Sequence, residues 1–245
     1  MGHIYKESFF NYIDFSSSRS ATAFIKCIDL PFKINTVLDV GCGRGAWLAQ
    51  WAEHGKNIYG VDGAYVNKDN LLISNENFDH QDISKPFDLG EKYDLVQCLE
   101  VAEHLQEKDA VTLIDNLIRH GDFILFSAAI PGQGGEFHVN EQPLNYWVNK
   151  FSQKGYSCFD YIRPQILKTK KIEPWYRYNS ILFIKNEKIL DLETKVKKTK
   201  VDGDHNFNQL VSFFWLTRNL ILRFLPDFLI NAIAKIKHYL MAMKK

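Results

Sequence analysis

Short apolar runs alternate with segments of helical spacing along most of the chain. Residues 46–51 and 109–120 carry apolar side chains at helical intervals, and Gly121 ends the second of these predicted helices. The runs that predict strands lie at residues 36–39, 58–62, 78–81, 93–99, 122–129, 156–162 and 179–185. This alternation predicts an α/β fold with a Rossmann-like, seven-stranded, mostly parallel sheet and helices on both faces.

Four segments with different composition follow one another along the chain. We interpret residues 1–35 as an N-terminal helical preface that covers the opening of a cofactor or substrate site. Packing of its aromatic residues against the rear face of a sheet is an equally good interpretation. Residues 36–185 form the predicted domain, and residues 186–204 are so rich in charge that we expect a linker or an exposed helix. Residues 205–245 predict amphipathic C-terminal helices.

Composition limits the classes of protein and of partner. A chain of 245 residues with 46% apolar residues holds one α/β domain and an appendage. Thirty basic residues balance 29 acidic ones, so we expect no nucleic-acid partner and a small or locally recognised ligand. The four cysteines lack metal-type spacing and suit reduced thiols, and no export or acylation signal is visible. We therefore expect a cytoplasmic protein.

A glycine-rich turn follows the first predicted strand. The segment TVLDVGCGRGAW at residues 36–47 ends its apolar run at Asp39 and then places Gly41, Gly43 and Gly45 at alternate positions. Glycines let a backbone approach a ligand closely, and the amides of a following helix face the same loop. The turn therefore predicts a nucleotide site, and the residues of this turn alone leave open whether the nucleotide is a dinucleotide.

The segment LDVGCGRGAW resembles the first motif of class I S-adenosylmethionine (SAM) dependent methyltransferases. In that family an acid two residues before the first glycine faces the methionine amino group, and Asp39 occupies this position. A dinucleotide would bring an anionic pyrophosphate, whereas SAM brings an ammonium and a sulfonium group. The charge of Asp39 therefore favours SAM.

Later segments resemble further motifs of the same family in order and spacing. The resemblance implies that Asp62 accepts hydrogen bonds from the ribose hydroxyls, and that Asp82 and Ile83 contact the adenine. Read as structure alone, both acids are also ordinary turn or cap residues. The segment YDLVQCLEVAEHL at residues 93–105 resembles the fourth motif. The cofactor-binding residues that we predict are Asp39, Gly41, Gly43, Gly45, Asp62, Gly63, Asp82, Ile83 and Glu100.

The polar loop IPGQGGEFHVNEQP after the fifth principal strand supplies the catalytic candidates. Such loops lie at the carboxyl edge of an open sheet, where ligands bind. We predict His138 as general base with Glu136 or Glu141 orienting it, and His104 as the second choice. Possible ligands of a divalent ion are His104, His138, Glu103, Glu136 and Glu141, but their spacing is not diagnostic, so we predict no metal. A structural role for either histidine stays open.

Two further segments bear on the acceptor and on partners. Residues 175–178, WYRY, predict an acceptor-site lining by aromatic and arginine side chains, or a cluster that covers the core. Residues 205–245 combine many apolar residues with six cations and one acid, and their longest charge-free stretch is too short to span a bilayer. This composition suits a membrane-surface anchor at the inner face, docking on the domain, or self-association.

The function that we expect is methyl transfer from SAM, with S-adenosylhomocysteine as product. The stretches GVDGAYV, LEVAEHL and FSAAIPGQGGEFHVNEQPLNYW resemble a bacterial group of methyltransferases associated with surface-glycan biosynthesis. That resemblance implies O-methylation of a sugar or glycoconjugate hydroxyl. The alternatives are a lipid or quinone-like acceptor at the membrane surface, and a non-catalytic SAM-binding module.

Overall fold

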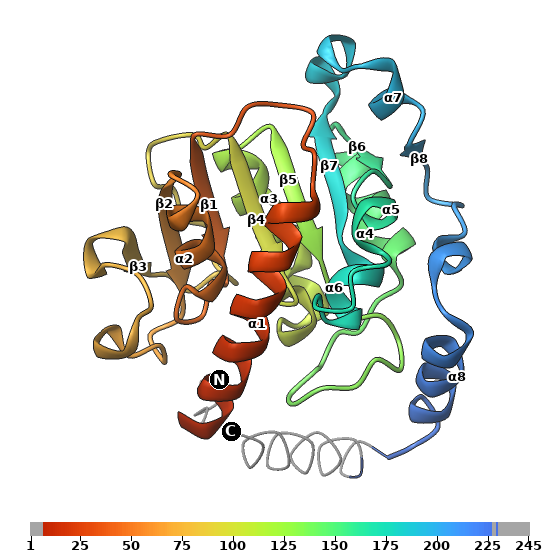
Figure 1. The fold of residues 1–245 in the computed structure, drawn as a ribbon, viewed down its shortest axis with the longest axis horizontal. Coiled ribbons are helices and arrows are strands. Elements are labelled where there is room, and N and C mark those ends of the chain that lie inside the picture. The colour runs from red at the N-terminus through yellow and green to blue at the C-terminus, as the bar shows by residue number, and fades with distance from the viewer. Residues whose placement is uncertain (1–6, 227–228, 230–245) are drawn as a thin grey trace.

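The computed structural model describes residues 7–226 and residue 229, and in this part of the chain it contains one mixed sheet of eight strands (Figure 1). The strand order is β3-β2-β1-β4-β5-β7-β6-β8; β1 to β5 pair in parallel, and β7 pairs antiparallel to β5 and β6. The strands are β1 (Thr36–Val40), β2 (Asn57–Asp62), β3 (Phe78–His80), β4 (Leu95–Leu99), β5 (Phe123–Ser127), β6 (Tyr156–Phe159), β7 (Ile181–Lys185) and β8 (Lys200–Val201). The predicted α/β sheet is confirmed, with β8 as an additional strand.

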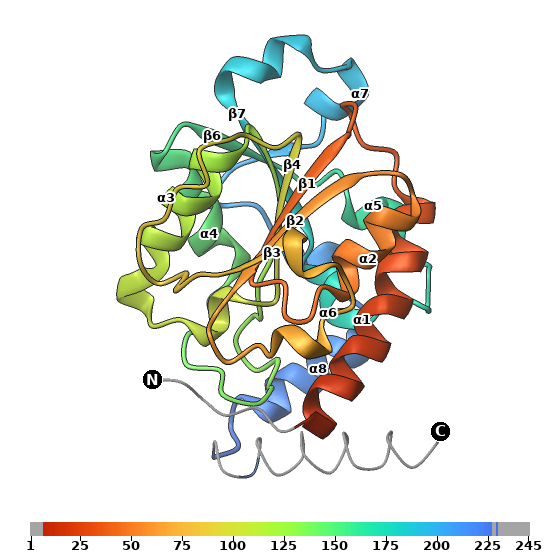
Figure 2. The same ribbon diagram turned by 90° about the vertical axis from the view of Figure 1, so that its left-hand side faces the viewer.

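Helices cover both faces of this sheet, as Figures 1 and 2 show. The first face carries α1 (Glu7–Cys27), α2 (Ala46–Glu53), α5 (Arg163–Ile166) and α6 (Pro174–Asn179). The second face carries α3 (Ala110–His120) and α4 (Leu144–Gln153). The other helices are α7 (Thr194–Lys197), α8 (Phe213–Leu222) and the 3₁₀ turns η1 (Lys68–Asn70), η2 (Asn75–Asn77), η3 (Ala102–His104), η4 (Glu107–Asp109), η5 (Asn186–Asp191) and η6 (Phe207–Leu210).

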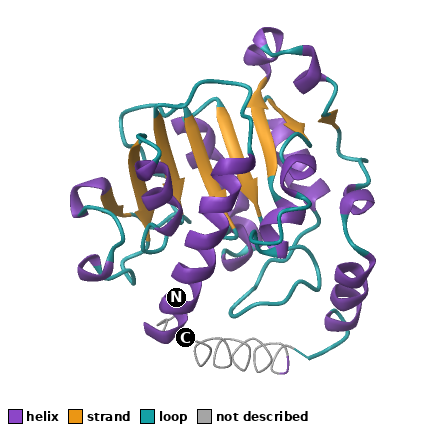
Figure 3. Cartoon of the chain, in the orientation of Figure 1, coloured by secondary structure: helices purple, strands orange, loops and turns teal. Residues whose placement is uncertain are grey.

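Two apolar cores lie between the sheet and its helices, because strands buried on both faces send successive side chains in opposite directions. Leu38 contributes to the core under α3 and α4, and its neighbour Val37 contributes to the core under α1 and α2. Phe151 of α4 stacks on Phe183 of β7 with ring centroids 3.9 Å apart. Figure 3 shows the resulting arrangement of a sheet between two helical layers. This rigid scaffold fixes the positions of the loops at the carboxyl edge.

The segment predicted as a charged linker, residues 186–204, packs in part on the domain. Val196 is fully buried and Leu192 nearly so, and β8 extends the sheet by pairing with β6. Further along, the guanidinium of Arg163 is buried, forms an ion pair with Asp160 and donates a hydrogen bond of 2.8 Å to the carbonyl of Phe207. These contacts hold the chain that leads to α8 against the sheet.

The C-terminal segment is described as far as residue 226 and at residue 229. Within the described residues, no helix is both long enough and apolar enough to cross a membrane. Helix α8 buries Trp215, Asn219 and Leu222, so one of its faces is docked. The rest of the helices predicted for residues 205–245 lies outside the described residues.

Candidate active site

The glycine turn after β1 has the conformation that its residue types predict. Gly41, Gly43 and Gly45 all have positive φ, which L-residues with a side chain rarely adopt. A Cβ on Gly41 would lie 2.5 Å from Val101, and one on Gly45 would lie 2.9 Å from Ile73. A Cβ on Gly43 would meet no atom within 4 Å, so this part of the turn faces open space. The turn is therefore closely packed at its ends and open at its centre, as a ligand cradle requires.

The two acids predicted to bind SAM lie at the ends of adjacent parallel strands. Asp39 and Asp62 are both 3% exposed. Asp62 accepts hydrogen bonds of 2.6 Å from the amides of Gly43 and Gly63, and one from the hydroxyl of Tyr65. The carboxylate of Asp62 thereby ties the glycine turn to the end of β2.

Burial changes the protonation of Asp39 more than any neighbour does. Desolvation raises the pKa of Asp39 to about 7, against the lowering effect of a hydrogen bond with Gln97 on β4. The nearby charge of Asp62 adds to the increase. Gln97 is itself fully buried and accepts a hydrogen bond of 2.9 Å from the indole of Trp51. A cationic ligand group beside Asp39 would favour its ionised form.

Asp82 and Ile83 follow β3, as predicted, but they lie in different environments. Asp82 is exposed, forms an ion pair of 3.0 Å with Lys85 and accepts a hydrogen bond of 2.6 Å from the Ser84 hydroxyl, which holds its pKa below the usual value. Ile83 is buried in the core under α3. The loop that carries both residues is anchored to β2 through a hydrogen bond of 2.8 Å from the Gln81 amide to the carbonyl of Asp62.

Glu100 directly follows β4 and has a strained backbone conformation, with φ of 58°. Its carboxylate accepts a hydrogen bond of 2.6 Å from the side chain of Gln133, which in turn accepts one of 2.7 Å from Asn179. Burial raises the pKa of Glu100. This chain of polar groups joins β4, the loop of residues 131–142 and the end of α6. We did not predict Gln133 or Asn179, because neither residue type carries a distinctive signal by itself.

The loop of residues 131–142 is organised around Glu141. The carboxylate of Glu141 accepts hydrogen bonds of 2.7 Å and 2.9 Å from the amides of Gly132 and Gly134, and it contacts Nδ1 of His138 at 2.8 Å. The predicted pairing of His138 with Glu141 is therefore present in the structure. Because Glu141 accepts from the Nδ1 side, the neutral imidazole has its lone pair on Nε2.

His138, His104 and Glu103 come together although they lie on two different elements. Nε2 of His138 is 4.0 Å from Oε1 of Glu103, and the rings of the two histidines meet edge to face with centroids 4.9 Å apart. The amides of Val139 and Asn140 donate hydrogen bonds of 2.9 Å and 3.1 Å to the carbonyl of Glu103, which fixes the loop against η3. We predicted both histidines as separate candidates; the structure makes them one cluster.

Glu103 is the least solvated member of this cluster. Its side chain is 1% exposed, and Oε2 has no hydrogen-bond partner among the residues that the structure describes. Burial, and after it the charge of Glu100, raises the pKa of Glu103 well above its usual value. The sequence pattern named Glu103 only as an alternative ligand, because its burial depends on how η3 packs.

The aromatic segment of residues 175–178 serves packing in part. Tyr176 is buried against Trp47 and shares a hydrogen bond of 3.1 Å with the Ser17 hydroxyl. Tyr178 is buried and packs against Trp215 of α8. These two side chains therefore hold α1 and α8 in place, as the core alternative proposed. Trp175 and Arg177 are half-buried at the surface of α6.

Helix α8 lies on the loop that carries His138. Arg218 donates a hydrogen bond of 2.8 Å to the carbonyl of Gln133, and its guanidinium stacks on Trp215. The carbonyl of Asn219 comes so close to Gly132 that a Cβ there would lie 2.2 Å from it. Among the three alternatives for this segment, docking on the domain is thus present for the described part of α8, which lies at the lower right of Figure 1.

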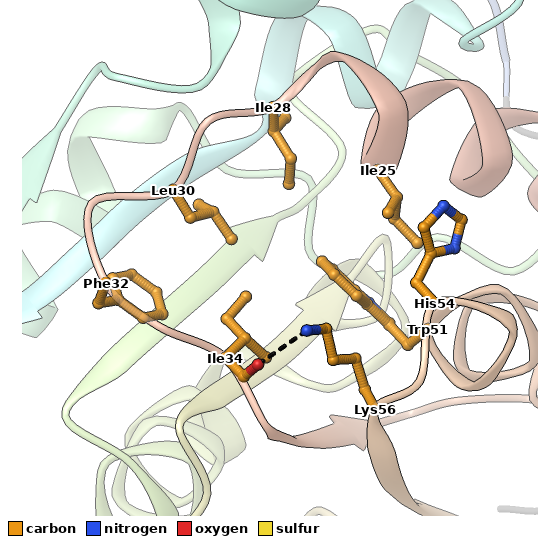
Figure 4. Close-up of a pocket in the computed structure, with 8 residues that line it drawn as sticks. All are labelled: Ile25, Ile28, Leu30, Phe32, Ile34, Trp51, His54 and Lys56. Atoms are coloured by element: carbon orange, nitrogen blue, oxygen red, sulfur yellow. Dashed lines mark hydrogen bonds between the residues drawn. The ribbon is translucent and has the colours of Figure 1, made fainter.

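A separate hollow lies at the opposite, amino edge of the sheet. It has a volume of about 300 Å³ and is lined mainly by apolar residues of α1, α2 and the segment before β1 (Figure 4). In Figure 4, Lys56 reaches across to the carbonyl of Ile34, at 2.9 Å. None of the predicted site residues lines this pocket.

Comparisons with known proteins indicate which family this chain resembles. A family model described as a methyltransferase domain matches residues 15–127. Two bacterial relatives are named ubiquinone biosynthesis O-methyltransferase. The one from Nitrosomonas europaea is 32% identical over 119 residues, which are 45% of this chain and 46% of the relative. The one from Cereibacter sphaeroides is 27% identical over 163 residues, 58% of this chain and 61% of the relative. The chain spans about half the length of the curated relatives it matches.

A solved structure shows the fold. Human N-acetylserotonin methyltransferase, crystallised with SAM, aligns with a TM-score of 0.51 at 18% identity, covering 72% of this chain and 55% of the human one. The glycan-specific part of the resemblance that we described has no counterpart in these comparisons, whereas the expected cofactor agrees with the ligand of the human protein. Residues 15–127 thus match a methyltransferase domain, and the chain has the class I SAM-dependent methyltransferase fold.

Proposed function

We propose that this chain is an enzyme that transfers the methyl group of SAM to a hydroxyl of a small molecule. The observation that carries the proposal is the juxtaposition at one sheet edge of a cradle for SAM and a paired His138 and Glu141. A binding module without turnover would need the first feature only. The methyltransferase domain over residues 15–127 supports the same reaction.

The cofactor contacts that we propose follow from charge and position. Asp39 faces the ammonium group of SAM, because an ionised carboxylate buried at this depth needs a cationic partner. Asp62 accepts from the ribose hydroxyls, for which a carboxylate offers two acceptor oxygens. The open centre of the turn at Gly43 lets the backbone lie against the cofactor. Asp82 and Ile83 are proposed for the adenine, on the resemblance alone.

Methyl transfer requires the acceptor hydroxyl to lose its proton. The hydroxyl oxygen attacks the methyl carbon in line with the sulfonium, so a carbon–oxygen bond forms while the carbon–sulfur bond breaks and S-adenosylhomocysteine leaves. Nε2 of His138 is the nitrogen with a lone pair on the side of the cluster, since Glu141 holds Nδ1. This nitrogen either accepts the hydroxyl proton itself or binds an ion that lowers the pKa of the hydroxyl. In either case His138 is required for turnover.

Of the two acceptor classes, we favour a quinone-like aromatic hydroxyl over a sugar hydroxyl. The relatives from Nitrosomonas europaea and Cereibacter sphaeroides carry the name ubiquinone biosynthesis O-methyltransferase. The burial of Tyr176 and Tyr178 removes two of the three aromatic side chains that we expected to stack on a sugar ring. A glycan acceptor stays a prediction of the sequence resemblance.

Contact with a membrane surface suits an apolar acceptor. Helix α8 exposes Phe213 and Phe214, at 85% and 78% exposure, and Phe224 just after the helix is 80% exposed. Large apolar side chains rarely gather on the surface of a protein without a partner. We propose that this face, next to the loop with His138, meets the lipid surface from which the acceptor comes. Self-association through the same face is the competing prediction.

A transfer assay tests the proposal. The full chain is incubated with SAM labelled in its methyl group and, in separate reactions, with a polyprenylated catechol and with a methyl glycoside. We expect label on the phenolic oxygen and its loss in His138→Ala. Transfer to the glycoside alone would restore the sugar hypothesis. Absence of SAM binding, or transfer at an unchanged rate by His138→Ala, would refute the proposed function.

A further inference from the structure

The cluster of Glu103, His104 and His138 has the composition of an open metal site. One ligand atom from each residue lies within 4.8 Å of the others. Two imidazoles and one carboxylate suit divalent transition ions such as Zn²⁺, Mn²⁺ and Fe²⁺, and three protein ligands leave coordination positions for water or substrate. The separation of 4.0 Å between Nε2 of His138 and Oε1 of Glu103 is about 0.6 Å wider than the roughly 3.4 Å between two ligands of a tetrahedral ion with bonds of about 2.1 Å, so the two side chains would move together by that amount to share one ion.

The surroundings of His138 match those of a metal ligand. A histidine that binds a metal through one nitrogen usually donates its other N–H to a carboxylate, which fixes the ring. His138 makes this contact with Glu141 at 2.8 Å, and two backbone amides hold Glu141 in turn. Nε2 is therefore the coordinating nitrogen, on the side of Glu103.

Glu103 supplies the second, independent indication of a ligand. A carboxylate oxygen removed from water needs a hydrogen bond or a cation. Oε2 of Glu103 is buried and lacks a hydrogen-bond partner within the described residues, in a side chain that is 1% exposed. The carboxyl groups of Glu100 and Glu141 lie near Glu103 as well.

The backbone holds the two ligand-bearing elements in a fixed relation. His104 and Glu103 belong to η3 directly after β4, and His138 belongs to the loop after β5. Two amides of the loop donate to the carbonyl of Glu103, so the register between η3 and His138 does not depend on any ion. Such preorganisation is what a binding site needs for affinity.

We propose that Glu103, His104 and His138 bind one divalent transition-metal ion, and that the acceptor hydroxyl coordinates this ion beside the methyl group of SAM. The inference rests on the proposed function and refines the role of His138 in it from direct base to ligand. The ion lowers the pKa of the bound hydroxyl, whose proton passes to solvent water, and the oxygen then attacks the methyl carbon. A pair of adjacent hydroxyls would occupy two of the open positions, which favours a catechol.

Metal binding can be measured without any substrate. The full chain, stripped with a chelator, is titrated with Mn²⁺ and followed by electron paramagnetic resonance. We expect one bound ion per chain, and at least tenfold weaker binding in Glu103→Gln, His104→Ala and His138→Ala. His54→Ala is the matched control, because His54 lies at the amino edge and lines the separate pocket. Wild-type protein without stoichiometric Mn²⁺, or variants with wild-type affinity, would overturn the site.

A second measurement covers the case in which the variants do not fold. Wild-type chain is treated with diethylpyrocarbonate with and without Mn²⁺, and modified histidines are counted by mass spectrometry. We expect Mn²⁺ to protect His104 and His138 and to leave His54 unprotected. Equal modification with and without Mn²⁺ would refute the proposal. Calorimetry with SAM separates the two proposals, since failure of SAM binding with intact Mn²⁺ binding contradicts the function alone.

Discussion

The buried acid of the glycine turn couples SAM binding to pH. Burial raises the pKa of Asp39 from 3.8 to about 7, so below this pH the empty protein holds Asp39 mainly in its neutral form. The ammonium group of SAM binds the ionised form. Affinity for SAM should therefore rise as pH rises towards 7 and then level off, and each SAM bound at lower pH should release a proton.

The size of this effect follows from the pKa. With a pKa of about 7, roughly a tenth of Asp39 is ionised at pH 6.0 and about three quarters at pH 7.5, which predicts an affinity about eightfold higher at pH 7.5. The α-amino group of SAM, with an ordinary pKa of about 7.7–8.0, is charged to about two thirds at pH 7.5, which reduces the expected increase in affinity to about sixfold. The expected proton release is about 0.9 per SAM at pH 6.0.

Calorimetry measures both quantities. SAM is titrated into the full chain at the two pH values, in buffers with different ionisation enthalpies, so that the released protons can be counted. Asp39→Asn should bind SAM weakly with little pH dependence. Asp62→Asn is the control, because Asp62 is a buried acid of the same site whose pKa is also raised. A wild-type affinity that is flat between the two pH values, or a slope that Asp39→Asn retains, would refute the reasoning.

The raised pKa of Asp39 also determines how the stability of the fold changes with pH. Because the folded state favours the neutral acid, the contribution of Asp39 to stability is most favourable below the unfolded pKa of 3.8 and is lost as pH rises towards about 7. Above that pH the cost of burying the charge is constant. Bound SAM should remove most of this cost, so the melting temperature should gain more from SAM at pH 7.5 than at pH 6.0.

Three further predictions concern catalysis, the turn and the exposed face of α8. His138→Ala should lower the rate of methyl transfer by about 10²–10⁴-fold with SAM affinity unchanged in calorimetry, and a wild-type rate would exclude the residue from the chemistry. Gly41→Ala should lower the free energy of unfolding in urea by about 3 kcal/mol, because it combines a positive φ with a Cβ 2.5 Å from a neighbouring side chain. Gly43→Ala should lower it by only about 1 kcal/mol, because no atom is near, and should weaken SAM binding. Equal losses of stability in the two variants would contradict this reasoning. Phe213→Ser with Phe214→Ser should abolish sedimentation with anionic liposomes at an unchanged melting temperature, and retained sedimentation would contradict the membrane proposal.

The parts of the structure that local pattern determines were predictable. Apolar runs gave the strands, and the glycines with Asp39 indicated the turn, because strand burial and positive φ leave direct marks on residue type. The family resemblance added Asp62, which the structure places against the amide of Gly43. These features needed no knowledge of how distant segments pack.

The features that depend on tertiary contacts were not predictable. Glu103 lies in η3 and His138 lies in the loop after β5, and their approach depends on two backbone hydrogen bonds that cannot be predicted from residue type. The strand β8 consists of two residues in a charged segment, so propensity gave no signal for it. Docking of α8 through Arg218 was one of three open alternatives, because apolar residues alone do not identify their partner.

A structure of the full chain with S-adenosylhomocysteine tests the central claim most directly. The account predicts that the product lies across the carboxyl edge, with its amino group at Asp39, its ribose at Asp62 and its sulfur directed to the space before His138. Product bound at another surface, or a sulfur that faces away from the cluster of Glu103, His104 and His138, would contradict it.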